Sequence, residues 1–166
     1  MVLSREKHNS SLYSILLILS RNKFFYDKIK LPDTFETRIY LMFMHFSIFM
    51  IISRKKKVKF EQKSYDNLFF HIENDLRELG FGDVSVNKKM KEFNKILYDI
   101  LLKLESPNKE NNHFEINQVL VSRYFEVLYS TKNTEYVNFK TYFNNFYNFC
   151  FELPLENMVE DAIKFI

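Results

Sequence analysis

Glycine is almost absent from this chain, and its scarcity restricts the fold more than any other feature. The 166 residues include only two glycines, Gly80 and Gly82, and three prolines. All-β folds need tight hairpins and positive-φ turns, which glycine serves best, so few such turns can form here. With 46% hydrophobic residues, a chain of this length can fill one sizeable core. We therefore predict an all-α protein, a single compact helical domain of about six to seven helices.

The spacing of the apolar residues places these helices along the chain. The predicted helices cover residues 10–26, 35–53, 61–79, 83 or 85 to 104, 116–129 and 135–153, and a short tail follows. Asp33 or Thr34 is expected to cap the second helix, directly after Pro32. The polar segment 105–115 contains Pro107 and is the best candidate for a subdomain boundary.

Both glycines lie in one short stretch, "LRELGFGDVSVNKK", between two strongly amphipathic segments. A residue with positive φ just past a helix end costs glycine little, so Gly80 is predicted to follow the end of the third helix. Phe81 is then expected to fold back onto the preceding turn, and Asp83 or Ser85 to cap the fourth helix. Such a corner needs no catalytic role. Its charged neighbours form either a solvated turn or a polar docking surface.

The second predicted helix contains the most hydrophobic run, "IYLMFMHFSIFMII", residues 39–52. Fourteen helical residues span about 21 Å, less than the roughly 30 Å of a bilayer core, so a buried core helix is the first interpretation and a peripheral membrane contact the second. The helix ends in a basic run, Arg54, Lys55, Lys56, Lys57 and Lys59. This run is either a solvated helix end or a surface for anionic lipid headgroups or RNA phosphates.

Motifs of catalysis and cofactor binding are missing from the sequence. It has no glycine-rich phosphate loop, no paired-cysteine motif and no nucleophile elbow, so we expect no catalytic residues, no cofactor, no metal and no small-molecule substrate. The single Cys150 favours a reducing compartment, the cytoplasm or an organelle matrix. His71 and Asp75 have a spacing that could bind a metal but is more often an ordinary surface pair. His45 is best explained as a hydrogen-bonded core histidine, and the aromatic stripe 136–151 as core rather than as a base-stacking surface.

Two ordered blocks of the sequence resemble one family. The blocks are "FFYDKIKLPDTFETRIYLMFMHFSIFMIISRKKK", residues 24–57, and "YDNLFFHIENDLRELGFGDVSVNKKMKEF", residues 65–93. Their Pro-Asp-Thr turn and Gly-x-Gly-Asp corner resemble those of the ubiquinol-cytochrome c chaperone family, and the resemblance extends over roughly residues 12–101. One departure lies in the fourth helix. The family often has Phe-Tyr-Gly-Arg where this chain has Ile96, Leu97, Tyr98 and Asp99.

The resemblance implies a non-enzymatic factor that binds newly made cytochrome b and assists assembly of the respiratory cytochrome bc complex. It also implies a small helical partner protein, work beside the ribosome, and a location in the cytoplasm or the mitochondrial matrix, peripheral at the inner membrane. Within the matched blocks, we expect the partner to contact a surface formed by Pro32, Asp33, Thr34, Arg38, His45, Asp75, Arg77, Gly80, Gly82, Asp83, Val86, Lys88 and Lys89. The alternative is an RNA- or ribosome-associated helical module that acts through its basic clusters.

Overall fold

The computed structural model describes residues 12–105, 114–129 and 133–166, and these residues form helices and no strand. A helical segment over residues 12–20 comes first. It is followed by α2 (Lys23–Asp27), α3 (Phe35–Lys55), α4 (Gln62–Glu78), α5 (Asp83–Leu104), α6 (Gln118–Tyr124), α7 (Thr134–Glu152) and α8 (Met158–Asp161). Short 3₁₀ turns cover Glu126–Leu128, Leu155–Asn157 and Ala162–Phe165. The all-α prediction is confirmed. Most of the predicted boundary loop, residues 106–113, lies outside the described residues.

Two predicted helices are shorter than the sequence suggested. The first ends at residue 20, and Asn22 begins a new helix because its side-chain oxygen accepts a hydrogen bond from the Phe24 N–H at 3.1 Å. Asparagine serves better as a cap than inside a helix, which explains the break. The fifth helix stops at Tyr124, and the following 3₁₀ turn allows both Phe125 and Leu128 to be buried.

Helix α3 forms the centre of the molecule and packs against α5 and α7. Fourteen of its 21 residues are buried, including Phe43, Phe46 and Phe49. Among the described residues, α3 is the one helix long and apolar enough to cross a membrane, yet most of its apolar surface lies inside the protein. The buried-core interpretation of the hydrophobic run is therefore confirmed.

The aromatic stripe on α7 supplies a second large part of the core. Phe139, Phe143 and Phe146 are fully buried, and His45 of α3 contacts the rings of Phe143 and Phe146. Such ring contacts stabilise the packing beyond the burial of area alone. The prediction that this stripe packs in the core is confirmed.

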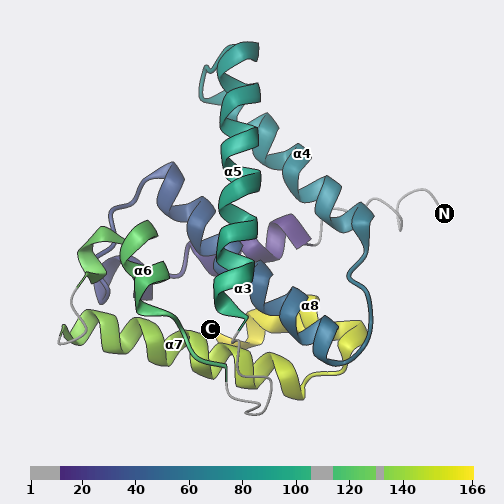
Figure 1. Ribbon diagram of the computed structural model, residues 1–166, viewed down its shortest axis with the longest axis vertical. Helices are drawn as coiled ribbons and strands as arrows, with labels where there is room; N and C mark the ends of the chain where they lie inside the picture. The colour runs from purple at the N-terminus through teal and green to yellow at the C-terminus, as the bar shows by residue number, and fades with distance from the viewer. Residues whose placement is uncertain (1–11, 106–113, 130–132) are drawn as a thin grey trace.

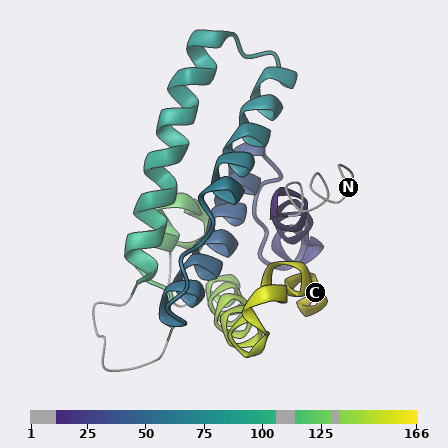
Figure 2. The same ribbon diagram turned by 90° about the vertical axis from the view of Figure 1, so that its right-hand side faces the viewer.

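Helices α4 and α5 form an antiparallel hairpin whose closed end points away from the rest of the molecule (Figure 1). Viewed from the side, the same end stands clear of the other helices (Figure 2). Helix α7 runs across the opposite end, near the C-terminus. The corner with both glycines is therefore a protruding tip.

Candidate partner-binding site

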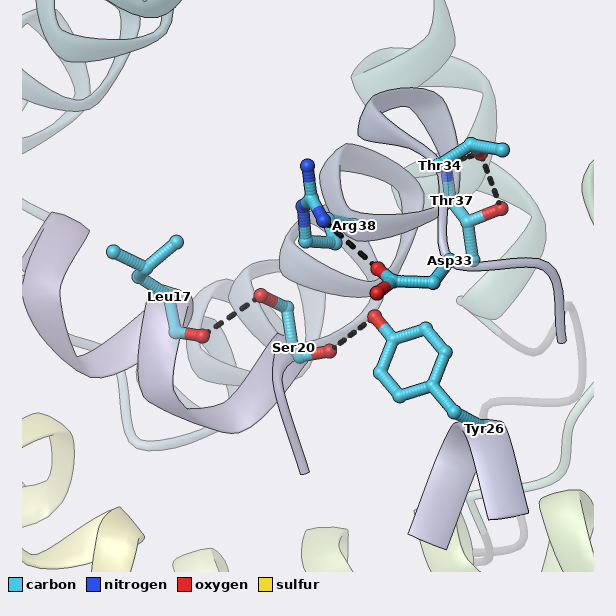
Figure 3. Close-up of polar contacts among 7 residues, drawn as sticks. All are labelled: Leu17, Ser20, Tyr26, Asp33, Thr34, Thr37 and Arg38. Carbon is cyan, nitrogen blue, oxygen red and sulfur yellow. Dashed lines mark hydrogen bonds and ion pairs between the residues drawn. The ribbon is translucent and has the colours of Figure 1, made fainter. Parts of the chain in front are cut away.

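The turn before α3 is held by short-range hydrogen bonds (Figure 3). Thr34 is the N-cap, and its hydroxyl oxygen accepts from the Thr37 N–H at 3.2 Å. Arg38 then forms an ion pair with Asp33 at 2.8 Å, across the first turn of α3. The capping prediction is confirmed for Thr34. Pro32, Asp33 and Thr34 are exposed, so this turn presents a fixed polar edge to solvent.

The segments before the turn are also held together by hydrogen bonds. The Tyr26 hydroxyl of α2 donates to the Ser20 carbonyl at 2.7 Å, and the Ser20 hydroxyl donates to the Leu17 carbonyl at 2.8 Å (Figure 3). The Tyr26 bond joins α2 to the end of the first helix, whereas the Ser20 hydroxyl bond lies within that helix.

The glycine corner has the geometry that the sequence predicts at Gly80. Its φ is +96°, its N–H donates to the Arg77 carbonyl at 3.0 Å, and the Phe81 N–H donates to the Leu76 carbonyl at 3.2 Å. This pair of bonds is the glycine-terminated helix end known as the Schellman motif. The capping prediction for α5 is wrong, because Gly82 is the N-cap and Asp83 is the first helical residue.

Charged side chains connect the corner to its surroundings. Arg77 forms ion pairs with Glu73, at 3.2 Å, and with Asp83 across the corner. Lys89 lies 3.9 Å from Glu36 of α3, and its ammonium group is 5.0 Å from the centre of the Phe81 ring. Lys89 therefore brings the two matched sequence blocks together. Lys88 is exposed beside it on α5.

A groove joins the two blocks directly. It has a volume of about 310 Å³ and lies between residues 12–20, the start of α3 and the end of α4. We call it the α3–α4 groove. Arg38 and Asp75 both line it, one from each block, and Leu17, Phe35 and Leu79 are among its apolar lining residues. Arg38 and Asp75 are thus parts of one surface.

The His71–Asp75 pair lies beside this groove and is occupied by other contacts. Asp75 accepts a hydrogen bond from the Tyr13 hydroxyl at 2.5 Å, and His71 stacks on the Tyr13 ring with 4.6 Å between ring centres. Burial and the Asp75 carboxylate raise the pKa of Tyr13. No group of three or more potential metal ligands occurs within the described parts of the chain. The pair is explained as a helix-to-helix contact.

The protruding tip exposes apolar side chains that the sequence analysis did not single out. Leu79 is 57% exposed, Phe81 37% and Val84 84%. These three residues, here called the apolar tip, lie within six positions and are surrounded by Arg77, Asp83 and other charged groups. The corner was expected to be polar. The alternation of apolar residues and glycine in "LGFGDV" was the available signal, since a short corner cannot fold every apolar side chain inward.

His45 and Val86 lie in the core rather than on a surface. Val86 is fully buried, and so is His45, whose ring nitrogens contact the Leu41 carbonyl at 2.6 Å and the Tyr142 hydroxyl at 2.9 Å. Burial lowers the pKa of His45 to about 4, although the bond to Leu41 opposes that shift. The core interpretation of His45 is confirmed. In this conformation neither side chain can touch a partner.

The basic run after α3 is partly used inside the molecule. Arg54 forms an ion pair with Glu105. The Lys55 ammonium group donates to the Tyr147 hydroxyl at 2.9 Å, and Lys56 donates to the Phe151 carbonyl at 2.7 Å, at the end of α7. Lysine at such a helix end satisfies carbonyls that lack helical partners and favours the dipole.

The rest of the run is more open. Lys57 and Lys59 are exposed. Lys57 adopts a positive φ of 58°, in the turn that leads from α3 toward α4. Lys55 and Lys56 of the run therefore contact α7, whereas Lys57 and Lys59 face the solvent.

Asp99, the departure from the family pattern, is a structural junction. It accepts hydrogen bonds from Tyr124, at 2.5 Å, and Arg123, at 2.9 Å, and it pairs with Lys103 at 2.8 Å. Partial burial favours the protonated carboxyl, but the bonds from Lys103, Tyr124 and Arg123 outweigh it and lower the pKa of Asp99. The carboxylate thus joins α5 to α6.

The single cysteine is shielded from solvent. Cys150 is buried in α7, and burial raises the pKa of its thiol to about 12. The thiolate is the reactive form of cysteine, so this side chain is inert at neutral pH.

Comparison with known proteins gives one match. No curated protein and no solved structure matches the chain. The sequence model of a family described as "Ubiquinol-cytochrome C chaperone" matches residues 27–133, which include the turn before α3, the glycine corner, Asp99 and α6. The match reaches further toward the C-terminus than the resemblance over residues 12–101 suggested, and it begins later, at residue 27. Because it covers well over half of the chain, the protein belongs to the ubiquinol-cytochrome c chaperone family.

Proposed function

We propose that this protein is a non-enzymatic chaperone that holds newly made cytochrome b while the ubiquinol-cytochrome c reductase complex is assembled. The family match carries the proposal, since it supports a chaperone role in the assembly of that complex. Cytochrome b is the partner that the family resemblance implies. The same resemblance supports a location on the matrix side of the mitochondrial inner membrane, or at its bacterial equivalent.

The apolar tip and the α3–α4 groove together form the proposed contact surface. A membrane protein that is not yet assembled exposes apolar segments, and a soluble partner can shield them only with apolar surface of its own. Val84 and Leu79 supply such surface at the closed end of the hairpin that α4 and α5 form. The charged rim of Arg77, Lys88 and Lys89 suits the polar ends of the bound segment. Leu79 belongs to both features, so they form one continuous surface.

Recovery of cytochrome b tests the proposal. The full-length protein with an affinity tag is expressed in cells that assemble a cytochrome bc complex and lack the untagged copy, and cytochrome b is quantified in the eluate. The unchanged protein should recover it, and Val84→Asp should lose most of it because a charge then faces an apolar segment. Removal of the protein should also lower the amount of assembled complex.

Val119→Asp is the matched control. Val119 is also the second residue of its helix and is 61% exposed, but it lies on α6. An acidic side chain is favourable in the first turn of either helix, so both variants should fold. The control should recover cytochrome b normally. If the unchanged protein never recovers cytochrome b and its removal leaves the complex at normal levels, the proposed function is wrong. Equal losses of cytochrome b recovery in Val84→Asp and Val119→Asp would exclude the tip as the contact.

A further inference from the structure

A second recessed surface lies at the opposite end of α3 from the tip. One cavity of about 370 Å³ is lined by Arg54, Lys57 and Lys59 together with apolar residues. A second cavity of about 130 Å³ lies beside α4 and α5 and includes Tyr98 and Leu101. Met50 and Phe60 line both, so the two cavities adjoin. We call them together the basic groove.

Positive charge is concentrated at one end of this groove. Lys57 and Lys59 have no ion-pair partner among the residues that the structure describes, whereas Arg54 shares its charge with Glu105. Lys55 and Lys56 bond only to uncharged oxygens in the described contacts, so they add to the positive field nearby. An anionic group is therefore favoured at this end.

The other end of the groove has a different character. Its walls are formed mainly by apolar and aromatic side chains, with Met50 and Phe60 at the junction and Glu61 and Gln62 as the polar members. The carboxylate of Glu61 lines this second cavity and would repel a chain of phosphates that continued along it. A nucleic acid needs cations along its whole backbone, and here they stop at the junction.

A ligand with an anionic head and an apolar tail matches both ends. We propose that the basic groove binds one anionic phospholipid, with its phosphate beside Arg54, Lys57 and Lys59 and one acyl chain along Met50 and Phe60 toward Leu101. Charged headgroup contact and buried methylenes then act together, as in other peripheral membrane sites. This site concerns a lipid and does not depend on the contact proposed for cytochrome b.

Calorimetric titration of the full-length protein tests the site with soluble short-chain phosphatidylglycerols below their micelle concentration. Binding should be saturable at one lipid per protein and should strengthen by roughly fourfold for each added methylene until the groove is full. The double variant Lys57→Gln/Lys59→Gln should weaken binding by about thirtyfold. Lys23→Gln/Lys28→Gln removes the same charge from exposed positions on and beside α2 and should have little effect.

Substitutions at the junction separate groove binding from adsorption to a charged surface. Met50→Glu places a carboxylate where the acyl chain would pass and should abolish binding, whereas Met50→Leu should preserve it. Circular dichroism establishes that each variant is folded. Inorganic phosphate alone, and phosphatidylcholine of the same chain length, should not compete.

Several results would overturn the lipid site. These are affinity that is independent of chain length, equal losses in the two lysine double variants, unchanged binding in folded Met50→Glu, or stronger binding of a single-stranded RNA at the same salt concentration. Cytochrome b recovery by the lysine variant provides a separate readout, so failure of the lipid site and failure of the proposed function can be told apart.

Discussion

Replacing each glycine of the corner by alanine gives two variants that differ almost only in backbone conformation. A Cβ atom added at Gly80 or at Gly82 would have no heavy atom within 4 Å apart from its own residue and the two adjacent residues, so neither would overlap a neighbouring group. Gly80 has a φ of +96°, where an L-residue is strained, whereas Gly82 has a φ of −76° in extended backbone. The expected difference in stability therefore comes chiefly from φ, with a smaller contribution from the N-cap position of Gly82.

The magnitudes follow from this geometry. Alanine at a left-handed position costs roughly 1–2 kcal/mol, so Gly80→Ala should lower the free energy of unfolding by about that amount. In a domain of this size the melting temperature should fall by roughly 2–8 °C. At Gly82, the loss of unfolded-state entropy offsets the weaker capping by alanine, and the change should stay within about 0.5 kcal/mol.

Urea unfolding followed by far-UV circular dichroism measures both values under identical conditions. Gly82→Ser should stabilise the protein by about 0.3 kcal/mol, because a serine hydroxyl can accept a hydrogen bond from a free N–H group at the start of α5. Equal effects of alanine at the two positions, or no effect at Gly80, would show that the corner does not hold the left-handed conformation in solution.

Two further predictions concern the buried and partly buried polar contacts. The pKa of His45 is about 4 in the folded protein, whereas an unfolded histidine has a pKa of about 6.5. Between these two values the unfolded chain binds more protons than the folded protein. The free energy of unfolding should therefore fall as the pH drops from 6.5 toward 4, by up to roughly 3 kcal/mol. Chemical denaturation between pH 5 and 6.5 should show this slope in the unchanged protein and a smaller one in His45→Asn; identical slopes would assign the proton uptake elsewhere. Asp99→Asn should cost about 1 kcal/mol by weakening the bonds from Lys103, Arg123 and Tyr124. A double-mutant cycle with Tyr124→Phe should give a coupling of about 0.5 kcal/mol or more, and strict additivity would contradict the shared junction.

Local features were predictable from the sequence, because their causes lie within a few residues. Thr34 caps α3 through Thr37, three positions away. At the end of α4, the Gly80 N–H bonds to the Arg77 carbonyl and the Phe81 N–H to the Leu76 carbonyl. Hydrophobic spacing likewise identified the buried faces. The first helix was predicted too long because periodic apolar spacing continued through Asn22, whose capping bond is visible only in the structure.

Contacts between distant segments were not predictable in the same way. The sequence shows Lys56 as one of five cations in a run, whereas the structure places it on the Phe151 carbonyl, 95 positions away. The α3–α4 groove likewise depends on how α3 crosses residues 12–20 and α4, which no local pattern specifies. The predicted partner list was therefore mixed: it contained Arg38 and Asp75, which share a groove, and His45, which lies in the core.

The two proposed binding surfaces lie at opposite ends of the same buried helix. The start of α3 lines the α3–α4 groove, and its last turn contributes Arg54 to the basic groove. Its 21 residues place these ends about 30 Å apart, so a protein segment at the tip and a lipid headgroup in the basic groove would not overlap. Because α3 is packed on several sides, it holds the distance between them nearly constant. A lipid bound in the basic groove would then direct the apolar tip away from the lipid headgroup. The tip would face a segment of cytochrome b that has not yet entered the bilayer, or a loop that lies outside it.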